Sequence, residues 1–314
     1  MNIITYLGVP MAILDEEEAI EGRWQSDAGP AEVVRIERPR REFWPQLREQ
    51  GFMPKPQWIT WLADVGDDEE SFIAALSSGE RQKIRLARRS LAAEGLTLTV
   101  RALDKKLFNE FYPLYQASLR RMRHGVSVAG DERDAILADR DRYFAICVAD
   151  RDQLVGCALA RREVDLDTVR VRFSAVDRPH REASLSRILY LEAAQVTRDF
   201  GHPTFSLGKD RNLYGHIAQP GLLRFKRQLG FIPYPSHHID PTTGYDQADI
   251  VLRTGELADP CMLLSYIDNT LGDQLRLEVF SAAKDVDLRP YTAKFDHGVR
   301  MHQLVADAVT AASS

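Results

Sequence analysis

The stretch of residues 168–234 constrains the fold most strongly, because strand-like and helix-like patterns alternate in it and each ends at a sharp break. Residues 168–176 (TVRVRFSAV) alternate between apolar and polar side chains, as a half-buried strand does. Apolar side chains then recur at helical spacing over residues 184–200, where Ser184 can cap the helix and Gly201 can end it. This half of the stretch predicts a strand followed by a helix.

A second strand and helix follow, and the helix ends at a glycine. Residues 204–207 are apolar enough for a short buried strand, and residues 221–229 place apolar side chains on one helical face before Gly230. The segment QLREQGFMPKP around Gly51 shares the pattern Gly-Phe-x-Pro-x-Pro with FKRQLGFIPYP around Gly230. A tandem pair of related units explains this repetition. The alternative is a chance recurrence of a glycine-capped helix that runs into a proline-flanked strand.

Two segments carry a resemblance to a known superfamily. The segments GLLRFKRQLGF (221–231) and ERQKIRLARRSLAAEGLTLTV (80–100) resemble the Fem-like branch of the GNAT acyltransferase superfamily, and the resemblance covers most of residues 44–252. It implies an α/β fold with a mixed, mostly antiparallel sheet flanked by helices, in two tandem GNAT-like lobes. It also implies an enzyme that passes an acyl or aminoacyl group to an amine.

The resemblance sets expected boundaries for the lobes. We expect a smaller first lobe over residues 1–98, which includes a basic helix at 67–93, and a complete GNAT-like lobe over residues 99–255. Residues 142–164 read as a hairpin with a polar turn, and together with the strand at 168 they supply three adjacent antiparallel strands.

The C-terminal extension, residues 256–314, is the least informative part of the sequence. Residues 260–275 and 295–311 have helical patterns, and residues 275–280 (LRLEVF) read as a strand between them. Completion of the first lobe and a dimer contact are both open as its role.

Composition and charge limit the functions to consider. A formal net charge of −5 gives no general attraction to nucleic acid, so an RNA partner would need a local basic patch. Three scattered cysteines suit a reducing compartment better than a disulfide framework. Adjacent residues His237 and His238 would point to opposite faces of a strand, so we expect no metal. The N-terminus lacks a basic signal region and no apolar run approaches the ~18 residues of a membrane span, so we expect a cytoplasmic protein without membrane spans.

The loop at residues 177–183 bears on the acyl donor. GNAT enzymes that use acetyl-CoA commonly carry Gln or Arg, two residues, Gly, one residue and then Gly or Ala here, so that backbone N–H groups surround the pyrophosphate. Arg178 and Ala183 fit the outer positions, but Arg181 stands where the glycine should be. The resemblance also assigns Val176 and Ser184, at the two ends of the loop, to the donor site.

Two donors are compatible with Arg181. In one, Arg178 and Arg181 bind the phosphates of acyl-CoA, or of a pantetheine carried by an acyl carrier protein, through their side chains. In the other, the pocket is closed and an aminoacyl-tRNA donor approaches along Lys226 and the basic helix. The acidic overall charge favours the pantetheine thioester.

Direct transfer to a primary amine on a small molecule or peptide needs proton transfer and an oxyanion donor, but no nucleophilic side chain. The candidates for catalysis are Asp210 and Tyr214, since GNAT enzymes often place a tyrosine near this position to protonate the leaving group. The resemblance gives Lys226 a contact with the donor's phosphates.

Further candidates come from two predicted helices. Five cations lie within residues 81–89 of the basic helix, and Arg85 and Arg88 among them could bind phosphate, although a solvated helix face is an equal alternative. In the next predicted helix, Tyr115, Arg120 and His124 occupy the position that walls the acceptor site in GNAT-like folds. Core packing for the tyrosine and surface exposure for the arginine are the structural alternatives.

Two classes of function remain open from the sequence. The first is an acyltransferase that forms an amide from an activated donor. The second is an inactive GNAT-like fold that binds a protein or RNA through the basic helix.

Overall fold

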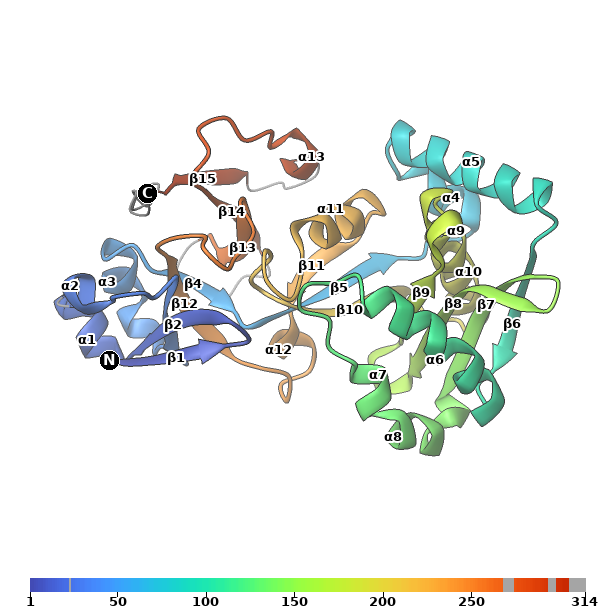
Figure 1. The fold of residues 1–314 in the computed structure, drawn as a ribbon, viewed down its shortest axis with the longest axis horizontal. Helices are drawn as coiled ribbons and strands as arrows, with labels where there is room; N and C mark the ends of the chain where they lie inside the picture. The colour runs from blue at the N-terminus through green and yellow to red at the C-terminus, as the bar shows by residue number, and fades with distance from the viewer. Residues whose placement is uncertain (23, 268–273, 293–297, 305–314) are drawn as a thin grey trace, which may run out of the picture. The chain divides into compact units, whose positions relative to one another are not determined.

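The computed structural model describes residues 1–304 except 23, 268–273 and 293–297. The chain forms two compact units, and each contains segments that are distant in sequence (Figure 1). Unit 1 comprises Met1–Thr60, Lys209–Arg227 and Pro233–Ser314. Unit 2 comprises Trp61–Gly208 and Gln228–Ile232.

A five-stranded sheet in the order β1-β2-β3-β12-β4 lies at the centre of unit 1. Strands β2 and β3 are parallel, and the other neighbouring pairs are antiparallel. The strands are β1 (Asn2–Tyr6), β2 (Val9–Leu14), β3 (Val33–Glu37), β4 (Met53–Pro56) and β12 (Asp246–Val251). The connecting helices are α1 (Glu16–Glu21), α2 (Trp24–Asp27), a 3-10 turn (Arg41–Phe43) and α3 (Trp44–Glu49).

The C-terminal extension completes unit 1. It forms a three-stranded sheet of β13 (Cys261–Tyr266), β14 (Leu275–Ser281) and β15 (Val299–Gln303). Leu263 and Phe280 of this sheet share a buried apolar cluster with Met11 and Val33 of the central sheet. The remaining helices of this part are α11 (Pro220–Gln228), α12 (Ser236–Ile239) and α13 (Arg289–Thr292).

A seven-stranded sheet in the order β11-β5-β10-β9-β8-β7-β6 forms unit 2. Strands β6 to β9 are antiparallel neighbours, whereas β9 and β10 run parallel. The strands are β5 (Trp58–Asp64), β6 (Thr97–Ala102), β7 (Tyr143–Asp150), β8 (Gln153–Glu163), β9 (Thr168–Val176), β10 (Thr204–Arg211) and β11 (Ile232–Pro235). The helices are α4 (Glu69–Ala74), α5 (Ser78–Ala93), α6 (Lys105–Leu119), α7 (Val128–Asp131), α8 (Arg133–Ala138), α9 (Arg178–Glu182) and α10 (Ser186–Asp199).

Helices cover both faces of this sheet (Figure 1). Phe173 of β9 packs edge-on against Tyr115 of α6, with ring centroids 5.7 Å apart. The next residue along the strand, Ser174, hydrogen-bonds to Tyr190 of α10 at 2.7 Å. Because adjacent strand residues point to opposite faces, α6 and α10 lie on opposite sides of the sheet. The predicted α/β class, with mixed, mostly antiparallel sheets flanked by helices, is confirmed.

The repeated Gly-Phe segments occupy equivalent places. In each, a helix (α3 or α11) ends at a glycine in the left-handed region, Gly51 with φ 89° and Gly230 with φ 85°, before an edge strand (β4 or β11). A side chain with a Cβ would strain either position. The next strand then joins the other sheet: β5, after β4, pairs beside β11, and β12, after β11, pairs beside β4. The two sheets therefore exchange one strand each.

This exchange makes the boundaries of the units differ from the predicted lobes 1–98, 99–255 and 256–314. The basic helix lies in unit 2, and residues 209–227 and 233–314 lie in unit 1. Pairing between strands sets the units, and it joins segments that are far apart in sequence.

Local predictions also need correction. The helix predicted at 67–93 is broken into α4 and α5, because Ser77 caps α5 by accepting from the backbone of Glu80. Ser184 does not cap a helix: its φ is 67°, and α10 begins at Ser186. The helix predicted at 260–275 is wrong, since β13 lies there, whereas the strand at 275–280 is confirmed as β14. The predicted helix at 295–311 contains strand β15 instead, and its residues 295–297 and 305–311 lie outside the described part of the chain.

Asn212 provides a test of how the extension is attached. It is 1% exposed, its side-chain nitrogen donates to the carbonyls of Pro56 (2.9 Å) and Leu264 (2.7 Å), and its oxygen accepts from the N–H of Leu264 (2.7 Å). Asn212→Ala should lower the free energy of unfolding by about 2–4 kcal/mol, because it leaves buried backbone groups without partners. Urea denaturation measures this loss. Asn109→Ala, at an exposed position, is the control, and an equal effect of both changes would contradict the assignment.

Candidate functional site

The parallel strands β9 and β10 pair over only three residues. Residues 204–206 pair with 168–170, after which β9 continues to Val176 and β10 to Arg211 without further pairing to each other. We call residues 170–176 and 206–208 the strand fork. Backbone groups along the two strands of the fork are not used in a ladder between them. An extended ligand with amide groups can pair with such strand edges.

Gly208 bends β10 at the strand fork. Its φ is 74°, and its N–H donates to the hydroxyl of Ser206 at 3.1 Å. A Cβ at this position would lie 3.2 Å from the carbonyl oxygen of Val171 on β9. Only glycine combines this backbone angle with this close approach at little cost.

A β-bulge lies on the other side of β9. Leu159 of β8 pairs with Phe173 and Ala160 pairs with Val171, so Arg172 has no opposite residue. A bulge of this kind re-aims a side chain. The guanidinium of Arg172 donates to the hydroxyl of Tyr143 at 2.7 Å and to Glu132 at 2.6 Å.

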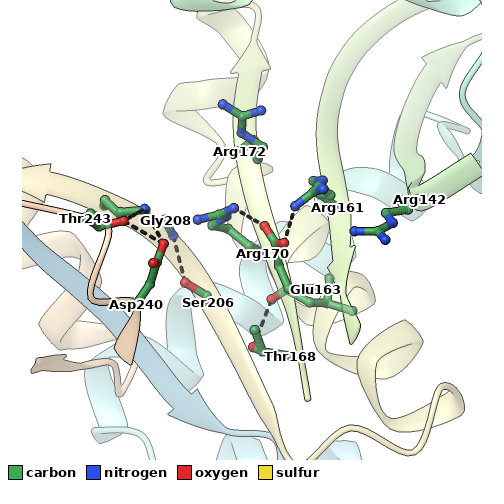
Figure 2. Close-up of polar contacts among 12 residues, drawn as sticks. Arg142, Arg161, Glu163, Thr168, Arg170, Arg172, Ser206, Gly208, Asp240 and Thr243 are labelled. Carbon is green, nitrogen blue, oxygen red and sulfur yellow. Dashed lines mark hydrogen bonds and ion pairs between the residues drawn. The ribbon is translucent and has the colours of Figure 1, made fainter. Parts of the chain in front are cut away.

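Arginines gather beside the strand fork (Figure 2). We call Arg142, Arg161, Arg170 and Arg172 the arginine face. Figure 2 shows Arg161 and Arg170 reaching the one carboxylate of Glu163. The Nε of Arg170 is buried and has no hydrogen-bond partner in the described chain. Burial lowers the pKa of Arg170, and the neighbouring arginines add to the shift while Glu163 opposes it.

Hydrogen bonds within the predicted donor loop engage its own backbone N–H groups. Asp177 caps the short helix α9 by accepting from the backbone N–H of His180 at 3.2 Å, and its carboxylate also contacts the ring of His180 at 2.6 Å. The N–H groups of five further residues bond to carbonyls within the same segment. These are Arg181, Ala183, Ser184, Leu185 and Arg187. Backbone groups that would surround a pyrophosphate are therefore already engaged.

The residues predicted for donor binding lie in different environments. Val176 is buried at the end of β9, and Ser184 is half-buried. Arg178 is exposed and paired with Glu182 at 3.3 Å, and Arg181 is exposed. The two arginines are thus accessible at the surface of unit 2, whereas Val176 offers no exposed side chain.

The structure brings the other three predicted residues together in unit 1. The ammonium of Lys226 donates to one carboxylate oxygen of Asp210 at 2.8 Å, and the hydroxyl of Tyr214 donates to the other at 3.2 Å. Tyr214 is fully buried, and Asp210 and Lys226 are 7% and 5% exposed. Burial lowers the pKa of Lys226, although Asp210 opposes this shift.

The residues predicted for acceptor binding differ in their surroundings. Tyr115 belongs to the core beneath α6, its hydroxyl donates to the carbonyl of Val126 at 3.4 Å, and burial raises its pKa. Arg120 is exposed at the end of α6, and His124 is half-buried. Tyr115 thus lies in the core and Arg120 at the surface, as the structural alternatives of core packing and surface exposure predict.

The cations of the basic helix are partly engaged. Arg81 donates to the carbonyls of Ala74 and Leu76, and Lys83 and Arg88 pair with glutamates. Arg85 is exposed and has no ion pair within the described chain. A solvated face and a phosphate site both fit this arrangement.

Sequence patterns did not single out the arginine face. Arg170 and Arg172 stood in a strand that alternates with apolar residues, and alternation marks such positions as solvent-facing. The sequence did contain one signal for the arginine face, namely several arginines on two adjacent predicted strands. Charged residues are uncommon in strands unless they are paired.

No protein-family model and no curated protein sequence matches this chain. Solved structures with a similar fold include FemX, with 13% identity, a TM-score of 0.47, and coverage of 79% of this chain and 82% of that one. They also include L-PGS from Bacillus licheniformis, with 12% identity, a TM-score of 0.43 and 81% of each chain covered. A tandem GNAT protein from the clavulanic acid biosynthesis pathway has 12% identity and a TM-score of 0.36, over 74% of this chain and 67% of that one.

Two features are absent from the described residues. None of their helices is long and apolar enough to cross a membrane. They contain no group of three or more His, Cys, Asp or Glu side chains that could hold a metal ion.

The buried Lys226–Asp210 pair can be tested by a double-mutant cycle. Asp210→Asn should lower the free energy of unfolding by about 3–5 kcal/mol, because it leaves the buried Lys226 charge without its carboxylate. Adding Lys226→Met should recover part of this loss. Glu110→Gln, which breaks the exposed pair with Arg101, should cost about 1 kcal/mol or less. If the losses of Asp210→Asn and Lys226→Met measured singly add up in the double variant, the pair does not act as a unit.

Proposed function

We propose that this protein transfers an acyl group from an activated donor to a primary amine and forms an amide. The strand fork is the observation that carries the proposal. A pantetheine arm is an extended chain with two amide groups, and unpaired edges of parallel strands offer it N–H donors and C=O acceptors. The bend at Gly208 keeps β10 close to β9 without a side chain between them.

The proposed reaction is direct. The amine nitrogen attacks the carbonyl carbon of the donor, the C–N bond forms, and the C–S bond of a thioester breaks. The amine gives up a proton and the leaving thiolate takes one. Backbone N–H groups of the strand fork would stabilise the oxyanion in the intermediate.

Tyr214 stays the predicted proton donor to the leaving group, and Asp210 the predicted partner that orients its hydroxyl. The hydrogen bond between them supports this assignment. Lys226 donates to the other oxygen of the same carboxylate, which fixes the position of Asp210 and with it the tyrosine hydroxyl.

The preferred donor is a pantetheine thioester, on coenzyme A or on an acyl carrier protein. The exposed Arg178 and Arg181 support it, since guanidinium groups bind phosphates by paired hydrogen bonds. The acceptor would be a primary amine on a small molecule or peptide, and Arg120 and His124 stay as predicted contacts for it.

A second donor is favoured by one specific observation. The N–H groups of the donor loop already donate to carbonyls and to the Asp177 carboxylate of the same segment, so this loop offers no backbone cradle for a pyrophosphate. An aminoacyl-tRNA needs no such cradle. In that case the exposed Arg85 and Arg88 of the basic helix would contact the phosphates of the RNA.

Gly208→Ala tests the role of the strand fork. Alanine at φ 74° should cost about 1–2 kcal/mol of stability, and its Cβ would crowd Val171. We expect a folded protein whose transfer rate falls about tenfold or more, measured as thiol release with acetyl-CoA or acetylated carrier protein and as amide product by mass spectrometry. Gly79→Ala, on the open face of α5, is the control and should retain activity. Full activity of Gly208→Ala would contradict the proposed site, and no turnover with thioester or charged-tRNA donors would favour an inactive binding module.

Arg181→Gly separates the two donors. A pantetheine enzyme should keep coenzyme A binding when this side chain is replaced by the glycine of the GNAT pattern, because bulk is removed at the loop and Arg178 still binds the phosphates. Titration calorimetry measures the binding. If neither the wild type nor this variant binds a pantetheine donor, while the protein retains charged tRNA at low salt, the tRNA-dependent reaction replaces the preferred one.

A further inference from the structure

A small polar cavity lies within unit 1. Its volume is about 20 Å³, and Arg35, Lys55, Arg211 and Gln247 are among the residues that line it. A volume of this size holds about one water molecule, or the end of a small polar ligand. The cavity therefore suits a head group rather than a whole metabolite.

One carboxylate forms ion pairs with two buried cations at this cavity. Asp249 is fully buried and accepts two hydrogen bonds from Arg35, both at 2.8 Å. The ammonium of Lys55, which is 1% exposed, lies 3.1 Å from the same carboxylate. Burial lowers the pKa of Lys55 to about 8, the charge of Arg35 adds to this shift and Asp249 opposes it. The pair of cations is thus only partly compensated, and an additional anion would be stabilised there.

Two further donors at the cavity are not used. The side-chain Nε2 of Gln247 is buried and has no hydrogen-bond partner in the described chain, while its oxygen faces Lys55 at 3.4 Å. The side chain of Arg211 has no ion pair or hydrogen bond within the described residues. Its guanidinium lies over the rings of Trp58 and Tyr6, at 4.3 and 5.3 Å from their centroids. A buried amide without a partner is costly, so this site is built to accept one.

We propose that this cavity binds the carboxylate group of a small ligand between the guanidinium of Arg211 and the amide of Gln247. The planar fork of an arginine matches the two oxygens of a carboxylate, and the amide N–H₂ supplies a further donor. Arg35, Lys55 and Arg211 carry three positive charges against the one negative charge of Asp249, so the carboxylate of a ligand would reduce the positive surplus. Binding here does not depend on acyl transfer.

Nuclear magnetic resonance of the full chain tests the proposal. Relaxation of ¹³C-labelled acetate measures binding to each variant, and the side-chain amide signal of Gln247 reports where the ligand binds. In the wild type we expect saturable binding that shifts this amide signal. Arg211→Gln removes the cation, and Gln247→Glu keeps the shape but adds a negative charge. Each should raise the dissociation constant about tenfold or more.

Arg224→Gln, at an exposed position on α11, is the matched control and should bind acetate like the wild type. If Gln247→Glu does not fold, Arg211→Gln alone decides the outcome. Acetate binding that survives Arg211→Gln, or no acetate binding at all, would overturn the proposal. Displacement of acetate by inorganic phosphate at a much lower concentration would also overturn it and assign the cavity to phosphate.

Discussion

The buried carboxylate of Asp249 is the interaction on which the arrangement of the first sheet depends. It lies on β12, between β3 and β4, and it binds Arg35 of the one strand and Lys55 of the other. A shift of β12 by one residue would turn this carboxylate to the other face and leave two buried cations without it. The register of the central strands is therefore tied to one charge, in addition to the backbone ladder. The same charge leaves a positive surplus beside the cavity.

Much of unit 2 could be predicted from sequence because its signals are local. The hairpin at 142–164 and the strand at 168–176 have alternating patterns, and Gly201 and Gly230 mark helix ends through backbone angles that other residues avoid. The exchange of β5 and β12 could not be predicted, since nothing in either strand says which sheet it joins. For the same reason an apolar run such as 261–266 reads equally well as helix or strand until its partner is known.

Only part of the candidate site could be predicted from the sequence. The sequence suggests Asp210, Tyr214 and Lys226 as three separate candidates. The structure places them in one hydrogen-bonded group, which no rule of sequence spacing predicts. Comparison with the GNAT glycine pattern treats residues 177–183 as a donor-binding loop. Asp177 and Pro179, however, are local signals for a capped helix. The buried partners of Lys55 and the arginine face depend on contacts between distant strands, which a single sequence does not record.

The exchanged strands also bear on how the chain is made. Strands β3 and β4 have both left the ribosome long before β12, which separates them in the finished sheet, has been synthesised. At synthesis rates of ~5–20 residues per second, the wait lasts on the order of ten seconds or more. During that time the strand edges of the nascent N-terminal segment are unpaired. Lys55, which is buried in the folded protein, also lacks its carboxylate partner. The order of translation thus makes the last third of the chain a requirement for the first sheet, and a truncated product would expose edges that other chains can pair with.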